Sequence, residues 1–174
     1  MFTLTSEIVR KADRLVSQCG TRNPRKIAKE LGIEILYMDF KRQRGAYKVI
    51  HRNRFVLIKN DLHPVMEKIV LAHEIGRDAL HRDEAIKQGG FQEFNIFDMR
   101  DSRMEYEVNI FASHLSLPDD DFLELVERGY DNQQIASALH SDINLVALKC
   151  EILIAEGYDL RPQEYRNLFL GQNN

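Results

Sequence analysis

Apolar positions recur along this chain at spacings that predict helices around a short group of strands. Between Ser6 and Gln18 they fall three or four apart, as on one face of a helix, and Gly20 follows as a stop signal. The same rhythm predicts further helices over residues 24–31, 64–82, 104–117, 119–128, 132–140 and 144–156. Short apolar runs predict strands at 33–38, 45–50 and 54–59, with a hairpin turn at 51–53.

These elements predict one α+β domain over residues 1–174, with a small, mostly antiparallel sheet. A chain of 174 residues suits a single domain. Within it we expect a core at 1–117, a helical C-terminal part at 118–160 and a tail at 161–174. The Gly- and Phe-rich stretch 88–101 is expected to be a loop.

The composition is that of an ordinary soluble globular protein, with 44% hydrophobic and 29% charged residues. No apolar run approaches the ~18 residues of a membrane span, and the N-terminal residues lack the apolar centre of a signal peptide. Cys19 and Cys150 lie far apart without a paired motif, which favours a reducing compartment. We therefore expect a cytoplasmic protein with no membrane partner.

Charge is unevenly distributed. Residues 1–60 hold 14 Lys and Arg against 5 Asp and Glu, whereas residues 118–160 hold 2 against 10. The basic half is either a surface that attracts an acidic partner or, as we favour, a solvated face. Residues 133–146 have the rhythm of a helix-turn-helix, but the second helix carries a single lysine, Lys149. Because DNA binding requires basic side chains there, we expect no direct DNA binding, and expect these helices to pack on the core or to dock a protein.

The segment from Leu71 to His81 carries the most informative chemistry. It contains His73 and Glu74 in the order found in the zinc-peptidase helix H-E-x-x-H, but Arg77 stands where the second histidine belongs. Histidines four apart lie one helical turn from each other and can bind one zinc ion, while the glutamate acts as general base on zinc-bound water. Arg77 removes one ligand and adds a permanent positive charge.

A second helix brings Glu105 about 25 residues later, as a third ligand of such sites would be placed. Residues 73–82 read HEIGRDALHR and residues 105–118 read EYEVNIFASHLSLP. These segments resemble the ImmA/IrrE family of metallopeptidases, whose pattern is HExGHxxLH followed by E-x-x-A-N/S-x-F-A and L-x-P. The resemblance spans most of residues 20–160 and implies a zincin-like fold, with motif helices at about 64–82 and 104–117.

The resemblance also implies roles. The zinc ligands would be His73 and Glu105, with Glu107 as the alternative if the register differs by two residues. Glu74 would be the catalytic base, zinc the one cofactor, and the remaining ligand position falls on Arg77. Family members cleave helix-turn-helix repressors of mobile elements or of a DNA-damage response, so such a repressor is the expected partner.

No nearby residue replaces the missing ligand convincingly. His81 lies eight residues from His73, roughly 12 Å along a helix, Asp78 points about 100° away from the ligand stripe, and His114 falls near the opposite face of the second helix. We therefore expect Arg77 to occupy the metal position between Glu74 and Glu105. Two functions stay open: a repressor-cleaving peptidase impaired by Arg77, which is the leading prediction, and a non-catalytic pseudopeptidase that binds a repressor or another protein partner.

The predicted hairpin offers a further contact surface. Arg42, Arg44, Arg52 and Arg54 cluster near it in the sequence. They either keep a strand edge soluble, which we favour, or contact an acidic segment. An extended substrate can pair with the edge of a zincin sheet, and we expect that edge along 46–50 or 55–58.

Overall fold

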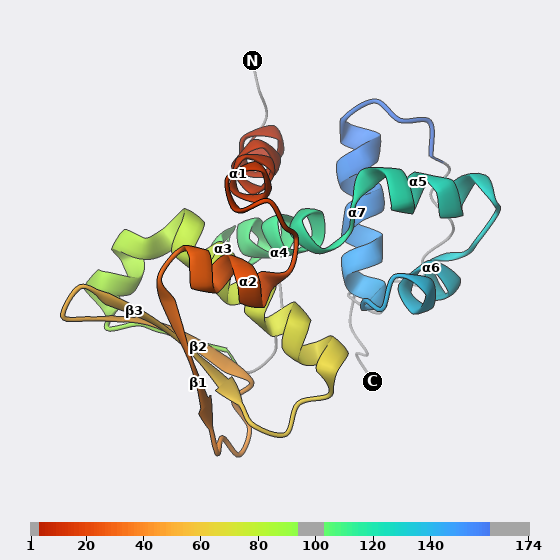
Figure 1. Ribbon diagram of the computed structural model, residues 1–174. Helices are drawn as coiled ribbons and strands as arrows, with labels where there is room; N and C mark the ends of the chain where they lie inside the picture. The colour runs from red at the N-terminus through yellow and green to blue at the C-terminus, as the bar shows by residue number, and fades with distance from the viewer. Residues whose placement is uncertain (1–3, 94–102, 161–174) are drawn as a thin grey trace, which may run out of the picture.

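The computed structural model describes residues 4–93 and 103–160, which form helices around one small sheet (Figure 1). The helices and strands are α1 (Leu4–Cys19), α2 (Pro24–Glu30), β1 (Ile33–Met38), β2 (Gly45–Ile50), β3 (Asn53–Lys59), α3 (Pro64–Gln88), β4 (Phe91–Glu93), α4 (Arg103–Ser116), α5 (Asp119–Glu127), α6 (Asn132–Ala138) and α7 (Ile143–Ala155). The predicted α+β class is confirmed. The predicted tail at 161–174 and most of the predicted loop at 88–101 lie outside the described residues.

The sheet has the strand order β1-β3-β2-β4. β1 is parallel to β3, whereas β2 is antiparallel to both β3 and β4, so the sheet is mostly antiparallel as predicted. The hairpin turns at His51 and Arg52, which have φ angles of 48° and 67°. Positive φ at both central positions is typical of a tight hairpin turn, although glycine and asparagine are the usual residues there. Asn53 already pairs with Ile50 and belongs to β3.

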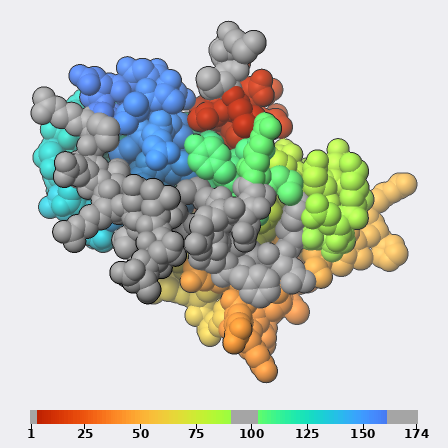
Figure 2. All heavy atoms as spheres, turned by 180° about the vertical axis from the view of Figure 1, so that it is seen from behind, coloured from red at the N-terminus to blue at the C-terminus, as the bar shows by residue number. Residues whose placement is uncertain are grey.

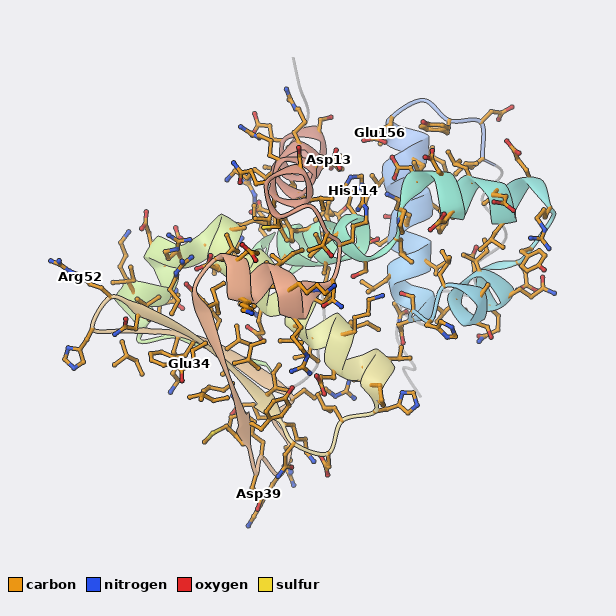
Figure 3. The ribbon with its side chains drawn as sticks, in the orientation of Figure 1. Asp13, Glu34, Asp39, Arg52, His114 and Glu156 are labelled. Carbon is orange, nitrogen blue, oxygen red and sulfur yellow. The ribbon has the colours of Figure 1, made fainter. Side chains whose placement is uncertain are left out.

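Three expectations about this sheet are wrong. β3 lies between β1 and β2, so residues 55–58 have no free edge for a partner strand. β4, which falls inside the predicted loop, pairs with residues 45–47 of β2. The four arginines also do not cluster, because Arg44 precedes one end of β2 and Arg52 lies in the turn at its other end. Figure 3 shows Arg52 at the tip of that hairpin.

Helices α2 and α3 cover one face of the sheet (Figure 1). The side chains of Tyr47, Val56 and Ile58 are fully buried beneath them. Asp78 on α3 connects the two layers: it accepts hydrogen bonds from Tyr47 of β2, from Arg54 of β3 and from Arg82 one turn further along α3. These hydrogen bonds connect the middle of α3 to β2 and β3.

Helix α3 is longer than predicted. It continues past Arg82 to Gln88 and ends at Gly89, whose φ of 77° is the left-handed conformation usual for a C-cap. Inside it, His81 has non-helical angles, φ −133° and ψ 29°, where the helix is kinked. No helix among the described residues has the length and apolarity to span a bilayer.

The C-terminal helices pack on α4. The six buried residues of α7 are Leu145, Val146, Leu148, Lys149, Ile152 and Leu153, and this face lies against α4. α6 and α7 therefore have the order of a helix-turn-helix, but Lys149 of the second helix is 0% exposed. The basic residue that DNA contact would require is inside the protein.

Candidate functional site

Helices α3 and α4 cross closely at Gly76. A methyl group at this position would lie 3.1 Å from Phe111 Cδ1 and 3.1 Å from Val108 Cγ1, so only glycine leaves α4 room to approach without displacement. Helices with small residues at their crossing can bring side chains one turn away into direct contact. Here that contact joins His73 and Arg77 of α3 to Glu105 and Asn109 of α4.

The predicted residues meet at this crossing. His73 Nε2 lies 3.4 Å from Glu105 Oε2. Its other nitrogen, Nδ1, lies 3.0 Å from the amide oxygen of Asn109. That oxygen can only accept, so Nδ1 carries the hydrogen and Nε2 is directed at Glu105. Metal-binding histidines are commonly oriented in this way by a carbonyl acceptor. The sequence motif contained Asn109, but its role is visible only in the fold.

Arg77 lies at the same point. Its Nη2 donates a hydrogen bond to Glu105 Oε1, and its Nε lies 3.9 Å from Glu74 Oε2. The guanidinium thus stands between two carboxylates and beside His73. Burial by itself would raise the pKa of Glu105, but the charge and the hydrogen bond of the adjacent Arg77 hold it well below its ordinary value. Glu105 is therefore a carboxylate at neutral pH, and Arg77 is its counter-ion.

The whole site is enclosed. His73 and Glu74 are 0% exposed and Arg77 is 2% exposed, while the Glu105 side chain retains 17%. The start of β2 lies over Glu74: a methyl group on Gly45 would approach Glu74 Oε1 to 2.9 Å and Val70 Cγ1 to 2.7 Å. A glycine here allows the strand backbone to lie directly against the proposed base.

Glu107, the alternative ligand, lies at a different place. Its Oε2 is 3.3 Å from His81 Nε2, and its Oε1 accepts a hydrogen bond of 2.6 Å from Arg103. Burial lowers the pKa of His81 even though the charge of Glu107 opposes this. The structure therefore brings Glu105, and not Glu107, to His73.

Comparison with known proteins supports the resemblance in sequence. The model of the IrrE N-terminal-like domain matches residues 28–151. The chain belongs to the ImmA/IrrE family. It is also 29% identical over 107 residues to "Uncharacterized immunity region protein 2" of Bacillus phage phi105, which covers 61% of this chain and 65% of that relative. The match thus spans less than two thirds of the relative's length.

ImmA/IrrE proteins are metallopeptidases, and the fold is zincin-like, as the motif predicted. Zinc in such a site requires three protein ligands and an open fourth position. Within residues 4–93 and 103–160, no three His, Cys, Asp or Glu side chains come together as a metal-binding group. His73 and Glu105 are suitable ligands, but the position of the third ligand is occupied by the Arg77 guanidinium, which donates a hydrogen bond to Glu105. The residues that the structure describes at this crossing therefore do not fit zinc.

The other candidate ligands are engaged elsewhere. Asp78 faces the sheet and binds Tyr47, Arg54 and Arg82. His114 contacts Asp13 of α1 and Lys149 of α7 instead of the α3–α4 site. Neither lies where it could supply the ligand that Arg77 replaces.

Proposed function

We propose that this chain is a non-catalytic ImmA/IrrE protein that binds a helix-turn-helix repressor without cutting it. The observation that carries the proposal is the ion pair of Arg77 with Glu105 beside His73. It supplies a fixed positive charge where a zinc site needs a ligand. Without a metal, none of the described side chains at this site lowers the pKa of water from about 15.7 towards 7. Glu74 then has no activated water to deprotonate.

The enclosure of the site supports the same conclusion. Hydrolysis requires a peptide carbonyl next to the general base, and Glu74 is 0% exposed. A protein partner can instead bind the outer surface. The role of a repressor as that partner is supported by the family and by the immunity region named in the phage relative.

Repressor cleavage, with Glu74 as base and zinc held by His73 and Glu105, is the second candidate. Family membership favours it. It would require Arg77 to leave Glu105 and another group to complete the metal site.

Zinc analysis and a binding assay separate the two functions. We expect the purified chain to hold no stoichiometric zinc, and Arg77→His to gain about one equivalent, because a histidine one turn from His73 completes three ligands. The repressor encoded nearest to the gene is then mixed with each protein. Calorimetry should detect a complex with the unaltered chain, and mass spectrometry should detect intact repressor.

Two variants serve as controls. Arg14→His places a histidine on the exposed face of α1, away from His73, and should bind no zinc. The double variant Arg77→His with Glu74→Gln should bind zinc and leave the repressor intact, which isolates the role of Glu74. Stoichiometric zinc together with repressor cleavage in the unaltered chain would exclude the non-catalytic function. Failure of that chain to form any complex with the repressor would exclude the proposed partner.

A further inference from the structure

A second buried group of charged side chains joins four helices near the C-terminal end of α4. His114 of α4 is 2% exposed and Lys149 of α7 is 0% exposed. Lys149 Nζ lies 2.8 Å from His114 Nδ1 and also donates to Asp119 of α5. His114 Nε2 lies 2.8 Å from Asp13 Oδ1 of α1. Figure 3 shows Asp13 and His114 at the contact between α1 and α4.

The geometry defines where the protons are. A lysine ammonium has three donors and no acceptor, so the nearby Nδ1 of His114 must accept and carries no hydrogen. The hydrogen of the neutral ring is then on Nε2, where it is donated to the Asp13 carboxylate. The cluster is satisfied only while His114 is neutral, because a proton on Nδ1 would face the ammonium at 2.8 Å.

We propose that His114 is an acid-sensitive latch, whose protonation at Nδ1 forces Lys149 away and releases α7 from α4. The latch also connects α1 and α5 through Asp13 and Asp119, so its release loosens the C-terminal helices from the zincin core. This proposal is independent of the repressor and of zinc.

The charged groups that face the latch act in both directions. Asp13 and Asp119 favour a protonated ring, with Asp119 Oδ1 3.8 Å from Nδ1. Lys149 and burial oppose protonation. Arg22 donates to the backbone carbonyl of His114, and Glu156 at the end of α7 adds a negative charge near Lys149.

Burial and the charge of Lys149 outweigh the two carboxylates in their effect on the pKa of His114. Burial, followed by the charge of Lys149, lowers the pKa of His114 below its ordinary 6.5. A histidine with a lowered pKa in the folded state binds fewer protons there than in the unfolded chain. Its contribution to stability is therefore complete above pH 6.5 and is lost as the pH falls below that value.

Chemical denaturation at pH 7.5 and 5.5 tests the latch. His114→Asn keeps an oxygen acceptor for Lys149 but cannot take a proton, and Lys149→Met removes the ammonium and leaves the ring facing carboxylates. Between the two pH values the folding equilibrium constant of the unaltered chain should fall more than that of either variant, because only the unaltered chain holds an ammonium 2.8 Å from a ring nitrogen that can take a proton. Comparison within the same protein cancels the contributions of the other histidines.

Matched controls lie on the surface. His140→Asn changes an exposed histidine whose φ of 49° asparagine adopts readily, and Lys26→Met changes an exposed lysine. Both should retain the acid response of the unaltered chain. Should His114→Asn fail to fold, Lys149→Met alone decides. Equal acid responses in the unaltered chain and in Lys149→Met would overturn the proposal.

Hydrogen exchange gives a local readout. At pH 5.5 the unaltered chain should lose amide protection in α7 before it does so in β2 and β3, and Lys149→Met should not. Simultaneous loss of protection in α7 and the sheet would show that acid unfolds the protein as a unit and would refute a latch.

Discussion

Helix α4 holds two buried clusters of similar composition and different chemistry. Near its start, Glu105 meets His73 and the cation of Arg77; near its end, His114 meets Lys149 and the carboxylates of Asp13 and Asp119. A guanidinium stays charged under all ordinary conditions, whereas a buried lysine and its histidine neighbour titrate. The first cluster is therefore a permanent connection between two helices, and the second responds to pH.

The clusters also differ in what remains when the cation is removed. Arg77 neutralises Glu74, which is 0% exposed, and Glu105, whose side chain is 17% exposed. Lys149 neutralises Asp119, which is 35% exposed, and water can solvate that carboxylate in its absence. The same substitution at the two positions should thus have unequal effects.

Replacement of the cations by methionine should give the largest difference. We expect Arg77→Met to reduce the free energy of unfolding by about 3–5 kcal/mol, because it removes the cation that lies between Glu74 and Glu105. Lys149→Met should cost less, about 1–2 kcal/mol at pH 7.5, because it leaves the buried Nδ1 of His114 without its donor, whereas water can solvate the 35% exposed Asp119. Urea denaturation measures both, and equal losses would show that the clusters are energetically alike.

The close crossing at Gly76 should give the next largest effect. Gly76→Ala forces α4 away from α3 and should cost about 1–3 kcal/mol. Val108→Ala removes Val108 Cγ1, one of the two side-chain atoms that the new methyl group meets at 3.1 Å. Gly76→Ala should therefore cost less in a protein that already carries Val108→Ala than in the unaltered chain. Thermal unfolding of the unaltered chain, the two single variants and the double variant measures this coupling. Purely additive effects would show that the new methyl group does not meet Val108.

Loss of the amide that orients His73 should be smaller. Asn109→Ala removes the acceptor 3.0 Å from Nδ1 and should cost about 1–2 kcal/mol, as expected for a buried donor deprived of its partner. Nuclear magnetic resonance of the His73 ring should show a changed tautomer balance. An unchanged ring signal would mean that Glu105 alone orients the imidazole.

The ion pair of Arg103 with Glu107 should contribute least. The Arg103 side chain is 77% exposed, and exposed pairs are worth about 0–1 kcal/mol. Arg103→Ala therefore serves as the reference for Arg77→Met in the same denaturation experiment. A loss that rivals the effect at Arg77 would mean that the Glu107 cluster, and not the Glu105 cluster, secures α3 to α4.

Local patterns predicted most of the elements. The bounds of β1 and β2 agree with the predicted apolar runs, and α2, α3, α5 and α6 begin at the predicted residues. α4 and α7 begin one residue early, and α1 begins at Leu4, ahead of its predicted start near Ser6. The end of α3 was predicted too early, because the polar residues after Arg82 resemble a helix end. The helix stops at Gly89. β4 was missed because its pairing with β2 spans the whole of α3 and leaves no local signal.

The site was predictable as far as helical spacing determines it. His73 and Arg77 are four residues apart on α3, and the family motif indicated Glu105 as their partner on α4. The parallel pairing of β1 with β3, which removes the expected free edge at residues 55–58, follows only from the topology. The partners of Asp78, Asn109 and His114 likewise come from other elements, and no spacing within one segment reveals them.

Arg77 has a consequence for the ancestry of this protein. The glycine at the helix crossing, the amide behind His73 and the carboxylate at 105 all hold the shape that a histidine at position 77 would need. Arginine and histidine codons can differ by a single nucleotide. Under the proposed function, one point mutation at position 77 therefore separates a site that binds zinc from one that does not, and the interior around it keeps its shape.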